Sequence, residues 1–286
     1  MTRALIACLA LSVTVPAAAQ DTWRAARLPE DDSLRVSTSR QEAALMAMVF
    51  DATASELRDS ERAGLRAALD RETERMHRRF PRGIPSLLER SHTTSQSEDA
   101  FDASIAAPAE ATRRAVVFLH GYGGNAALPC ALVAEAAARS GAMTVCPSVD
   151  GAGRWRGARG ARIVDATLDW LEDRGVDHVV LAGLSSGAVG ASLLARRFER
   201  RLAGLLLLSG AAREARTTLP ALVVQGDEDT MTGPAAARAF ARRSRRSELV
   251  MLEGNHFLLL HEREPILRRV ADWLGQLPPP RDGAPR

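Results

Sequence analysis

The chain has 286 residues, enough for one domain with a full hydrophobic core and a further segment. Its formal net charge is +3, but all 38 basic residues are arginines, and the absence of lysine excludes Ser–Lys dyads, Schiff-base enzymes and P-loop nucleotide sites. Aromatic residues make up 4% of the chain, so the composition indicates no stacking platform for single-stranded nucleic acid and no nucleic-acid partner.

Residues 1–19 have the features of a signal peptide. Arg3 supplies a positive charge, residues 4–15 form an apolar run, and three alanines at 17–19 are typical of a cleavage site. The run is too short to span a bilayer, so we expect no stable membrane insertion and an exported protein, periplasmic or secreted. A faint lipoprotein-like box ends at Cys8, but it lies too early to follow a hydrophobic region.

Residues 20–90 are expected to form an N-terminal arm and a helical segment. Residues 21–39 are polar and turn-rich, which predicts a loosely held arm. Residues 41–80 have helical periodicity, and a possible capping box at Thr53 and Glu56 would divide them into two helices. This helical segment is interpreted either as a lid or partner-binding element, or as a helical pair covering one side of the core; the second interpretation is favoured.

From residue 91 onward the sequence predicts an α/β domain that extends to residue 276. A polar linker at 91–98 and an outer strand at 100–106 precede a regular alternation of strands and helices. The expected strands lie at 115–120, 142–146, 178–183, 203–209, 220–225 and 247–252, and the expected helices at 126–139, 161–174, 187–198, 234–244 and 262–275. This order is typical of a mostly parallel central sheet with helices on both faces, and the Pro-rich tail at 277–286 predicts disorder.

A serine stands at the predicted junction of a strand and a helix. The apolar run at 179–182 leads directly into a Gly-x-Ser-x-Gly pattern at 183–187, centred on Ser185, and helical spacing follows. The two glycines suit a turn so tight that a Cβ atom would clash with the neighbouring backbone. Such a turn lifts the serine hydroxyl clear of the sheet and directs the first N–H groups of the helix toward it.

Two further motifs follow predicted strands. The acidic turn at 226–229 offers three carboxylates, at Asp227, Glu228 and Asp229, and a strand-end acid of this kind can hold a histidine in the right tautomer. His256 follows the last predicted strand and can serve as a general base, whereas its competitor His261 begins the final helix.

A glycine-rich loop at 120–125 has two interpretations. His120 and Gly121 end a predicted strand, and a His-Gly pair at this place resembles the loop that supplies an oxyanion-hole N–H in the α/β-hydrolase family. The same loop also matches a dinucleotide fingerprint, with Asp150 near the place of a ribose-binding acid. Export and the motifs farther along the chain disfavour the dinucleotide interpretation.

The order Ser185, Asp229, His256 resembles the catalytic triad of the α/β-hydrolase family over roughly residues 100–276. The spacing typical of that family, counted from the glycine at 226, implies Asp229 as the acid in preference to Asp227 and Glu228. The resemblance implies a serine hydrolase whose oxyanion hole uses the N–H groups of Tyr122 and Ser186, and which needs no cofactor. The short connection between 209 and 220 is similar to the small capless carboxylesterase and dienelactone-hydrolase-like branches, which implies a small-molecule ester substrate. A peptidase or amidase with the same triad, and a non-catalytic exported binding protein, remain as alternatives.

Two expectations concern the residues between the loop and the serine. Cys130 and Cys146 are predicted at the same edge of the sheet and are expected to form a disulfide in an exported protein. Trp155, in an arginine-rich stretch at 146–162, is expected to bind substrate at the mouth of the site. The alternatives are a solvated loop and a tryptophan that belongs to the core. No histidine or cysteine pattern indicates a metal site.

Overall fold

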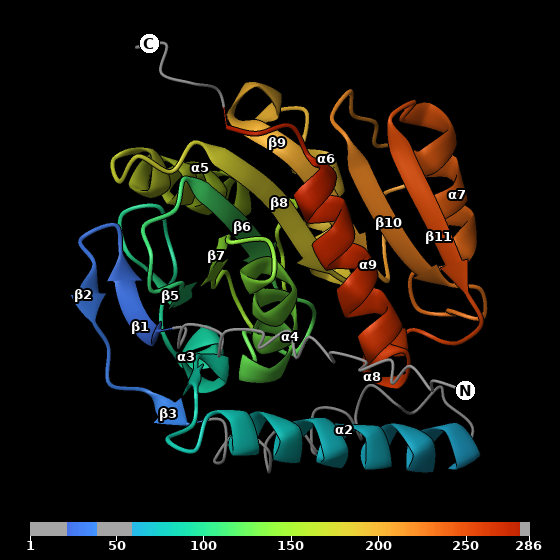
Figure 1. The fold of residues 1–286 in the computed structure, drawn as a ribbon, viewed down its shortest axis with the longest axis horizontal. Helices are drawn as coiled ribbons and strands as arrows, with labels where there is room; N and C mark the ends of the chain where they lie inside the picture. The colour runs from blue at the N-terminus through green and yellow to red at the C-terminus, as the bar shows by residue number, and fades with distance from the viewer. Residues whose placement is uncertain (1–21, 39–58, 281–286) are drawn as a thin grey trace, which may run out of the picture.

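The computed structural model describes residues 22–38 and 59–280. A nine-stranded mixed sheet has the order β11-β10-β9-β8-β6-β7-β5-β1-β2 (Figure 1). Its strands are β1 (Thr22–Leu28), β2 (Asp32–Ser33), β5 (Phe101–Ala107), β6 (Arg114–Leu119), β7 (Met143–Pro147), β8 (His178–Leu184), β9 (Leu202–Leu208), β10 (Ala221–Gly226) and β11 (Ser247–Leu252). A separate pair contains β3 (Ser37–Thr38) and β4 (Pro85–Ser86). Every strand expected from residue 100 onward is confirmed, with ends within two residues of the expected ones.

Strands β6 to β11 form the parallel part of the sheet, and β5 and β1 extend it in antiparallel orientation. Strands β6 to β10 are buried along nearly their whole length, whereas β11 at the edge of the sheet is partly exposed. Burial on both faces explains why β9 is a nearly continuous run of leucines. Successive residues of β6 point to opposite faces, so Val117 and Leu119 belong to one hydrophobic cluster and Val116 and Phe118 to the other.

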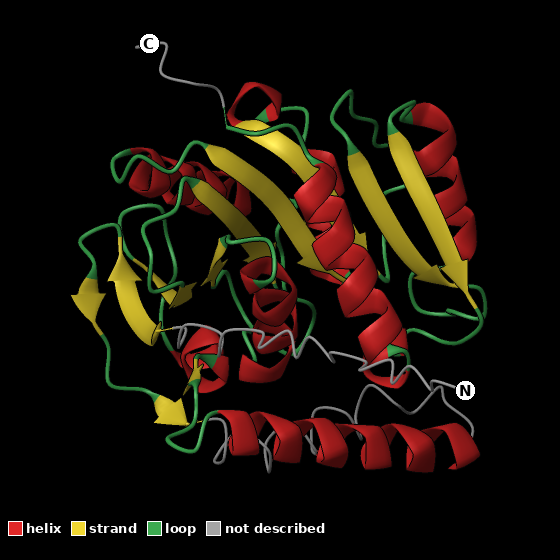
Figure 2. Ribbon diagram, in the orientation of Figure 1, coloured by secondary structure: helices red, strands yellow, loops and turns green. Residues whose placement is uncertain are grey.

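Helices cover both faces of the sheet, as expected (Figure 2). The helices of the parallel region are α4 (Ala127–Ala138), α5 (Ala158–Glu172), α6 (Ser186–Leu194), α7 (Pro234–Arg243), α8 (Leu258–His261) and α9 (Arg263–Gln276). Helices α5, α6 and α7 contribute to one hydrophobic cluster, and α4, α8 and α9 contribute to the other. In Figure 1, α4 and α9 cross in front of the strands. No helix among the described residues is long and apolar enough to cross a membrane.

The expectation of a loose arm at 21–39 is wrong for its first half, because β1 is a strand of the main sheet. It pairs with β5 along its whole length, from Thr22 opposite Ala107 to Leu28 opposite Phe101. The guanidinium of Arg27 lies 2.7 Å from the buried carboxylate of Asp102 on β5. The predicted linker at 91–98 is likewise wrong in part, since helix α3 spans Leu88–Thr93.

Helix α2 (Asp59–Arg79) lies across the side of the sheet toward which β8, β10 and β11 point (Figure 1). Its buried positions follow a helical stripe and are Leu65, Ala68, Leu69, Glu72 and Met76. The helix packs against α4 and α8, so it covers the core as the favoured interpretation expects. The possible capping box at Thr53 and Glu56 lies outside the described residues, as does the expected signal peptide.

The chain beyond α9 is ordered farther than expected. Leu277 is buried, and His178 Nε2 donates a hydrogen bond of 2.6 Å to the carbonyl oxygen of Pro278. The prediction of disorder from residue 277 is therefore wrong at its start, and residues 281–286 lie outside the described part of the chain.

Candidate active site

Ser185 occupies the turn between β8 and α6, with φ 56° and ψ −122°. This strained conformation costs on the order of 1–3 kcal/mol and persists only where the surroundings enforce it. The expected role of the glycines holds: a Cβ atom on Gly183 would lie 2.4 Å from the carbonyl of Gly187, and one on Gly187 would lie 2.0 Å from the carbonyl oxygen of Leu119. Only glycine therefore fits at either position.

Three predicted site residues form one hydrogen-bonded series. His256 Nε2 lies 2.9 Å from Ser185 Oγ, and His256 Nδ1 lies 2.8 Å from Asp229 Oδ2. Because an ionised carboxylate can only accept hydrogen bonds, Nδ1 carries the proton and Nε2 is left to accept from the serine hydroxyl. The arrangement can thus move a proton from Ser185 to His256 while Asp229 holds the imidazole ring.

The carboxylate of Asp229 is buried and fully hydrogen-bonded. One oxygen accepts from the backbone N–H groups of Met231 and Thr232, and the other from Gln225 Nε2 at 2.7 Å and Thr232 Oγ1 at 2.8 Å. Burial alone would raise the pKa of Asp229. The hydrogen bond and the charge of His256, together with the hydrogen bonds from Thr232, outweigh burial and hold the pKa of Asp229 well below its usual range. Asp229 therefore stays ionised.

The competing acids and histidine stand apart from this series. Asp227 accepts a hydrogen bond from the N–H of Gly254, and Glu228 is exposed. His261 lies in α8, away from the serine's hydrogen-bond partners. Gln225 is a site residue that sequence reasoning missed. Its place as the next-to-last residue of β10, four before Asp229, is the one signal that could have suggested it.

The loop after β6 touches the serine. A Cβ atom on Gly121 would lie 3.3 Å from Ser185 Cβ, so the backbone of the loop approaches the turn closely. Within the described part of the chain, neither the Tyr122 nor the Ser186 N–H has a hydrogen-bond acceptor. Ser186 begins α6, where the first N–H groups have no partner within the helix. Both groups remain available to an anion.

The same loop rests on helix α3, which sequence reasoning had assigned in part to a linker. Ser91 Oγ accepts a hydrogen bond of 3.1 Å from the N–H of Asn125, and His92 Nε2 donates one of 3.0 Å to the carbonyl oxygen of Gly123. The N–H of Gly123 is in turn bonded to the carbonyl oxygen of Gly151 at 2.8 Å. The loop conformation is therefore determined from two sides.

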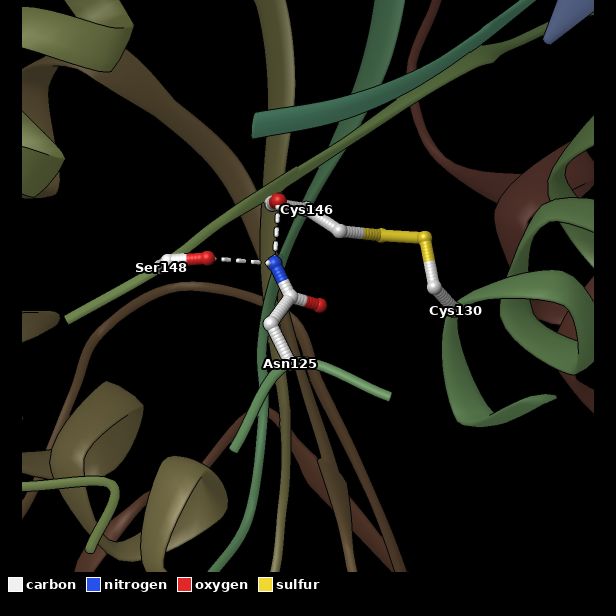
Figure 3. The surroundings of a disulfide bond; sticks show 4 residues. All are labelled: Asn125, Cys130, Cys146 and Ser148. Atoms are coloured by element: carbon white, nitrogen blue, oxygen red, sulfur yellow. Dashed lines mark hydrogen bonds between the residues drawn. A yellow bond between two sulfur atoms is a disulfide. The ribbon is translucent and has the colours of Figure 1, made fainter. Parts of the chain in front are cut away.

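The expected disulfide joins Cys130 of α4 to Cys146 of β7 (Figure 3). Beside it, Asn125 Nδ2 donates hydrogen bonds to the carbonyl oxygen of Cys146 at 2.8 Å and to Ser148 Oγ at 3.0 Å. The loop after β6 and the first turn of α4 are therefore both tied to the end of β7.

Trp155 is buried, and the expectation that it lines the mouth of the site is wrong. The side chain is 0% exposed, its indole N–H donates a 2.9 Å hydrogen bond to the carbonyl oxygen of His120, and its ring meets the His120 imidazole edge to face. A Cβ atom on Gly190 of α6 would lie 2.3 Å from Trp155 Cβ, so the helix has a gap that the indole fills. The arginines of this stretch reach solvent, as do Gly157 and Ala158. One of these arginines, Arg154, pairs with Asp150.

His120 is a buried neutral base. Its Nδ1 donates to the carbonyl oxygen of Gly121 at 2.8 Å, and its Nε2 accepts from the N–H of Val149 at 3.3 Å. Burial lowers the pKa of His120 to about 4, so the ring is uncharged at neutral pH. The carboxylate of Asp150, the acid of the dinucleotide interpretation, is bound by Arg154 and the N–H of Ala152.

A pocket opens directly onto Ser185 and His256. Its lining is mainly apolar and comes from the loop after β6 and from α2, α3, α4 and α8; the apolar side chains are Leu69, Leu88, Ala126, Leu128, Pro129, Leu132, Leu184, Met231, Phe257, Leu259 and Leu260. Tyr122 and Met231, which are 64% and 40% exposed, stand at its rim. Among the described residues no group of three or more His, Cys, Asp or Glu could hold a metal ion.

Comparison with solved structures identifies the fold of the chain. No family model matches the sequence, and no curated protein matches it. Esterase Pf2001 from Pyrococcus furiosus superposes with a TM-score of 0.53 at 16% identity, over 64% of this chain and 90% of that one. The chain has the α/β-hydrolase fold. Est1E from Butyrivibrio proteoclasticus superposes with a TM-score of 0.51 at 18% identity, over 61% of this chain and 93% of that one. A cold-adapted esterase from an Arctic intertidal metagenomic library superposes with a TM-score of 0.52 at 17% identity, over 63% of this chain and 89% of that one.

Proposed function

We propose that the protein is a serine hydrolase that cleaves carboxylic esters through an acyl-enzyme. The observation that carries this proposal is the hydrogen-bonded series from Asp229 through His256 to Ser185 at the base of an apolar pocket. A serine with this partner becomes a nucleophile when the substrate carbonyl arrives, because the imidazole accepts its proton.

Each residue has one task in the reaction. Ser185 Oγ attacks the ester carbonyl while His256 Nε2 takes its proton, and the negative charge on the carbonyl oxygen is met by the N–H groups of Tyr122 and Ser186. His256 then returns the proton to the leaving alcohol, which gives the acyl-enzyme. Water, deprotonated by the same nitrogen, hydrolyses the acyl-enzyme and releases the acid. Asp229 keeps the ring oriented and stabilises the imidazolium.

Two features favour an ester over an amide. The pocket has an apolar lining, which suits the hydrocarbon part of an ester, and none of its described lining residues is Asp, Glu or Arg. The structural neighbours named above are esterases by name. A peptidase or amidase with the same triad is the second candidate, because both reactions use the same geometry.

A fluorophosphonate probe tests the nucleophile. We expect the wild-type protein to be labelled, Ser185→Ala to remain unlabelled, and the matched variant Ser186→Ala to be labelled, since Ser186 contributes only its backbone N–H. An unlabelled wild-type protein would instead indicate a binding protein that keeps the fold. A panel of nitrophenyl esters beside peptide nitroanilides then separates the two enzyme classes: turnover of anilides at rates similar to those of esters would favour the amidase.

We further infer that the protein is exported. The signal-peptide features at 1–19 and the Cys130–Cys146 disulfide support this, since disulfides persist in oxidising compartments. Expression of the full chain in a bacterium, followed by fractionation and intact-mass measurement, tests it. The mass of a chain that begins near Gln20 in the periplasm or medium is expected; an uncleaved chain in the cytoplasm would contradict the inference.

A further inference from the structure

One wall of the pocket beside Ser185 comes from helix α2, which precedes the alternating strands and helices of the fold. Leu69 belongs to α2, more than a hundred residues before the serine in sequence, yet it lines the same pocket as Ser185. Around it lie Leu88 of α3, Leu132 of α4 and Leu260 after the start of α8. The chain therefore closes part of its site with a helix that precedes the motifs of the active site.

We propose that α2 is a fixed wall of an acyl-binding pocket and that Leu69 limits the length of the acyl chain that fits. This proposal rests on the proposed ester hydrolysis and goes beyond it by naming the substrate class: esters of uncharged, aliphatic carboxylic acids. The acyl group is the part of an ester that remains attached to Ser185 after the alcohol has left. An apolar pocket in contact with the serine thus stabilises it through both half-reactions.

Ion pairs hold α2 in place one turn beyond Leu69. Glu72 is buried, and its carboxylate lies 2.8 Å from Arg263 Nε at the start of α9. The Arg263 guanidinium also contacts Glu135 of α4, which pairs with Arg79 near the end of α2 at 3.2 Å. Moving α2 would take the buried Glu72 carboxylate away from Arg263, its partner on α9, which is costly for a buried charge. The helix is therefore a wall, and the lid interpretation of the helical segment is disfavoured for α2.

The chemistry of the lining determines which acyl groups fit. Leu69 is 8% exposed, so its side chain is covered on one side by the core and faces the pocket on the other. The described lining contains no Asp, Glu or Arg, so a charged acyl group would lose its hydration without gaining a partner. An aliphatic chain instead buries apolar surface with every added methylene, until it meets Leu69.

The test uses the full-length protein with two substitutions of opposite size and one control. Leu69→Ala lengthens the pocket and Leu69→Phe shortens it. Met76→Ala removes a side chain that is buried on the same helix face but does not line the pocket. Each variant is assayed with p-nitrophenyl esters of two to twelve carbons, and with a second series of constant acyl group and varied alcohol. Fluorophosphonate labelling counts the active serines in each sample, and urea unfolding shows that each variant folds.

We expect Leu69→Ala to raise kcat/KM for long relative to short acyl chains by about 10- to 200-fold, and Leu69→Phe to lower that ratio. Met76→Ala should reduce stability and leave the profile unchanged. Folded, labelled Leu69 variants with the wild-type profile would overturn the proposal, as would a shift confined to the alcohol series or one equally large in Met76→Ala. A wild-type protein that is neither labelled nor active on any ester would overturn the proposed function itself, and this proposal with it.

Discussion

Replacing Trp155 with alanine should destabilise the protein strongly. The indole is fully buried between the loop after β6 and helix α6, and Gly190 leaves the gap that it fills. Truncating a buried tryptophan to alanine costs about 3–5 kcal/mol, because the lost burial is added to the cavity left behind. About 1–3 kcal/mol of this comes from the carbonyl oxygen of His120, which loses its partner at 2.9 Å.

The effect on activity separates a core residue from a substrate contact. Because the His120 carbonyl begins the loop that carries Tyr122, Trp155→Ala should lower kcat/KM for all acyl lengths by a similar factor, about 10- to 100-fold, through misplacement of that loop. Trp155→Phe keeps one aromatic ring but loses the N–H and part of the indole's volume, so its stability and activity should fall between those of wild type and alanine. Urea unfolding and an ester panel measure both quantities on the same samples. Unchanged unfolding free energy with an altered order of ester preference would refute the core assignment.

Three further outcomes follow from the contacts of the site. Asp229→Asn should lower kcat by about 10⁴-fold in a folded protein, because the wrong tautomer of His256 is then favoured; a loss under tenfold would displace Asp229 as the acid. Replacing Cys130 and Cys146 with alanine should lower the free energy of urea unfolding by about 3 kcal/mol, because the disulfide closes a loop across a 16-residue separation and so restricts the unfolded chain. Equal stability of the oxidised and reduced wild-type protein would contradict this. The pKa of His120 is about 4 in the folded protein, against 6.5 for the unfolded chain. The neutral ring therefore contributes fully to the unfolding free energy above pH 6.5, and roughly 3 kcal/mol of that free energy is lost as the pH falls toward 4. An unfolding free energy that stays constant across this window would show that the folded protein binds the proton as readily as the unfolded chain does.

The parallel half of the fold could be predicted from sequence because its signals are local. Each strand from β6 to β10 is a short apolar run, and the helices between them have regular spacing. Ser185, Asp229 and His256 follow the ends of β8, β10 and β11, and this order indicated residues that the structure brings within hydrogen-bond distance. The carboxyl ends of parallel strands lie on the same side of the sheet, so residues that directly follow these strands in the chain lie close together in space.

Trp155 and β1 were misjudged because their environments come from distant residues. Four arginines surround Trp155 in sequence and suggest exposure, whereas the gap that buries it is made by Gly190 in another helix. Strand β1 carries Arg24 and Arg27 and little of the β-branched composition typical of strands. Its pairing with β5, and the buried acid Asp102 that receives Arg27, cannot be inferred from residues 22–28 alone.

The contacts of Asp102 explain why the N-terminal segment belongs to the same folding unit as the active site. This fully buried carboxylate on β5 pairs with Arg27 of β1 and Arg90 of α3, and it accepts a further hydrogen bond from Gln96. Burial would raise the pKa of Asp102, but the hydrogen bonds of Arg90, Arg27 and Gln96 hold it below its usual value. Removing residues 20–90 would take away both arginines and leave Gln96 as the remaining side-chain partner of the buried Asp102 charge, a loss of about 3–5 kcal/mol. It would also remove the first turn of α3, the helix that carries His92, which supports the loop beside the serine. Strand β1 and helix α3 are thus coupled to the site through the ion pairs of Asp102, and sequence change in these two elements is expected to alter both stability and the geometry around Ser185.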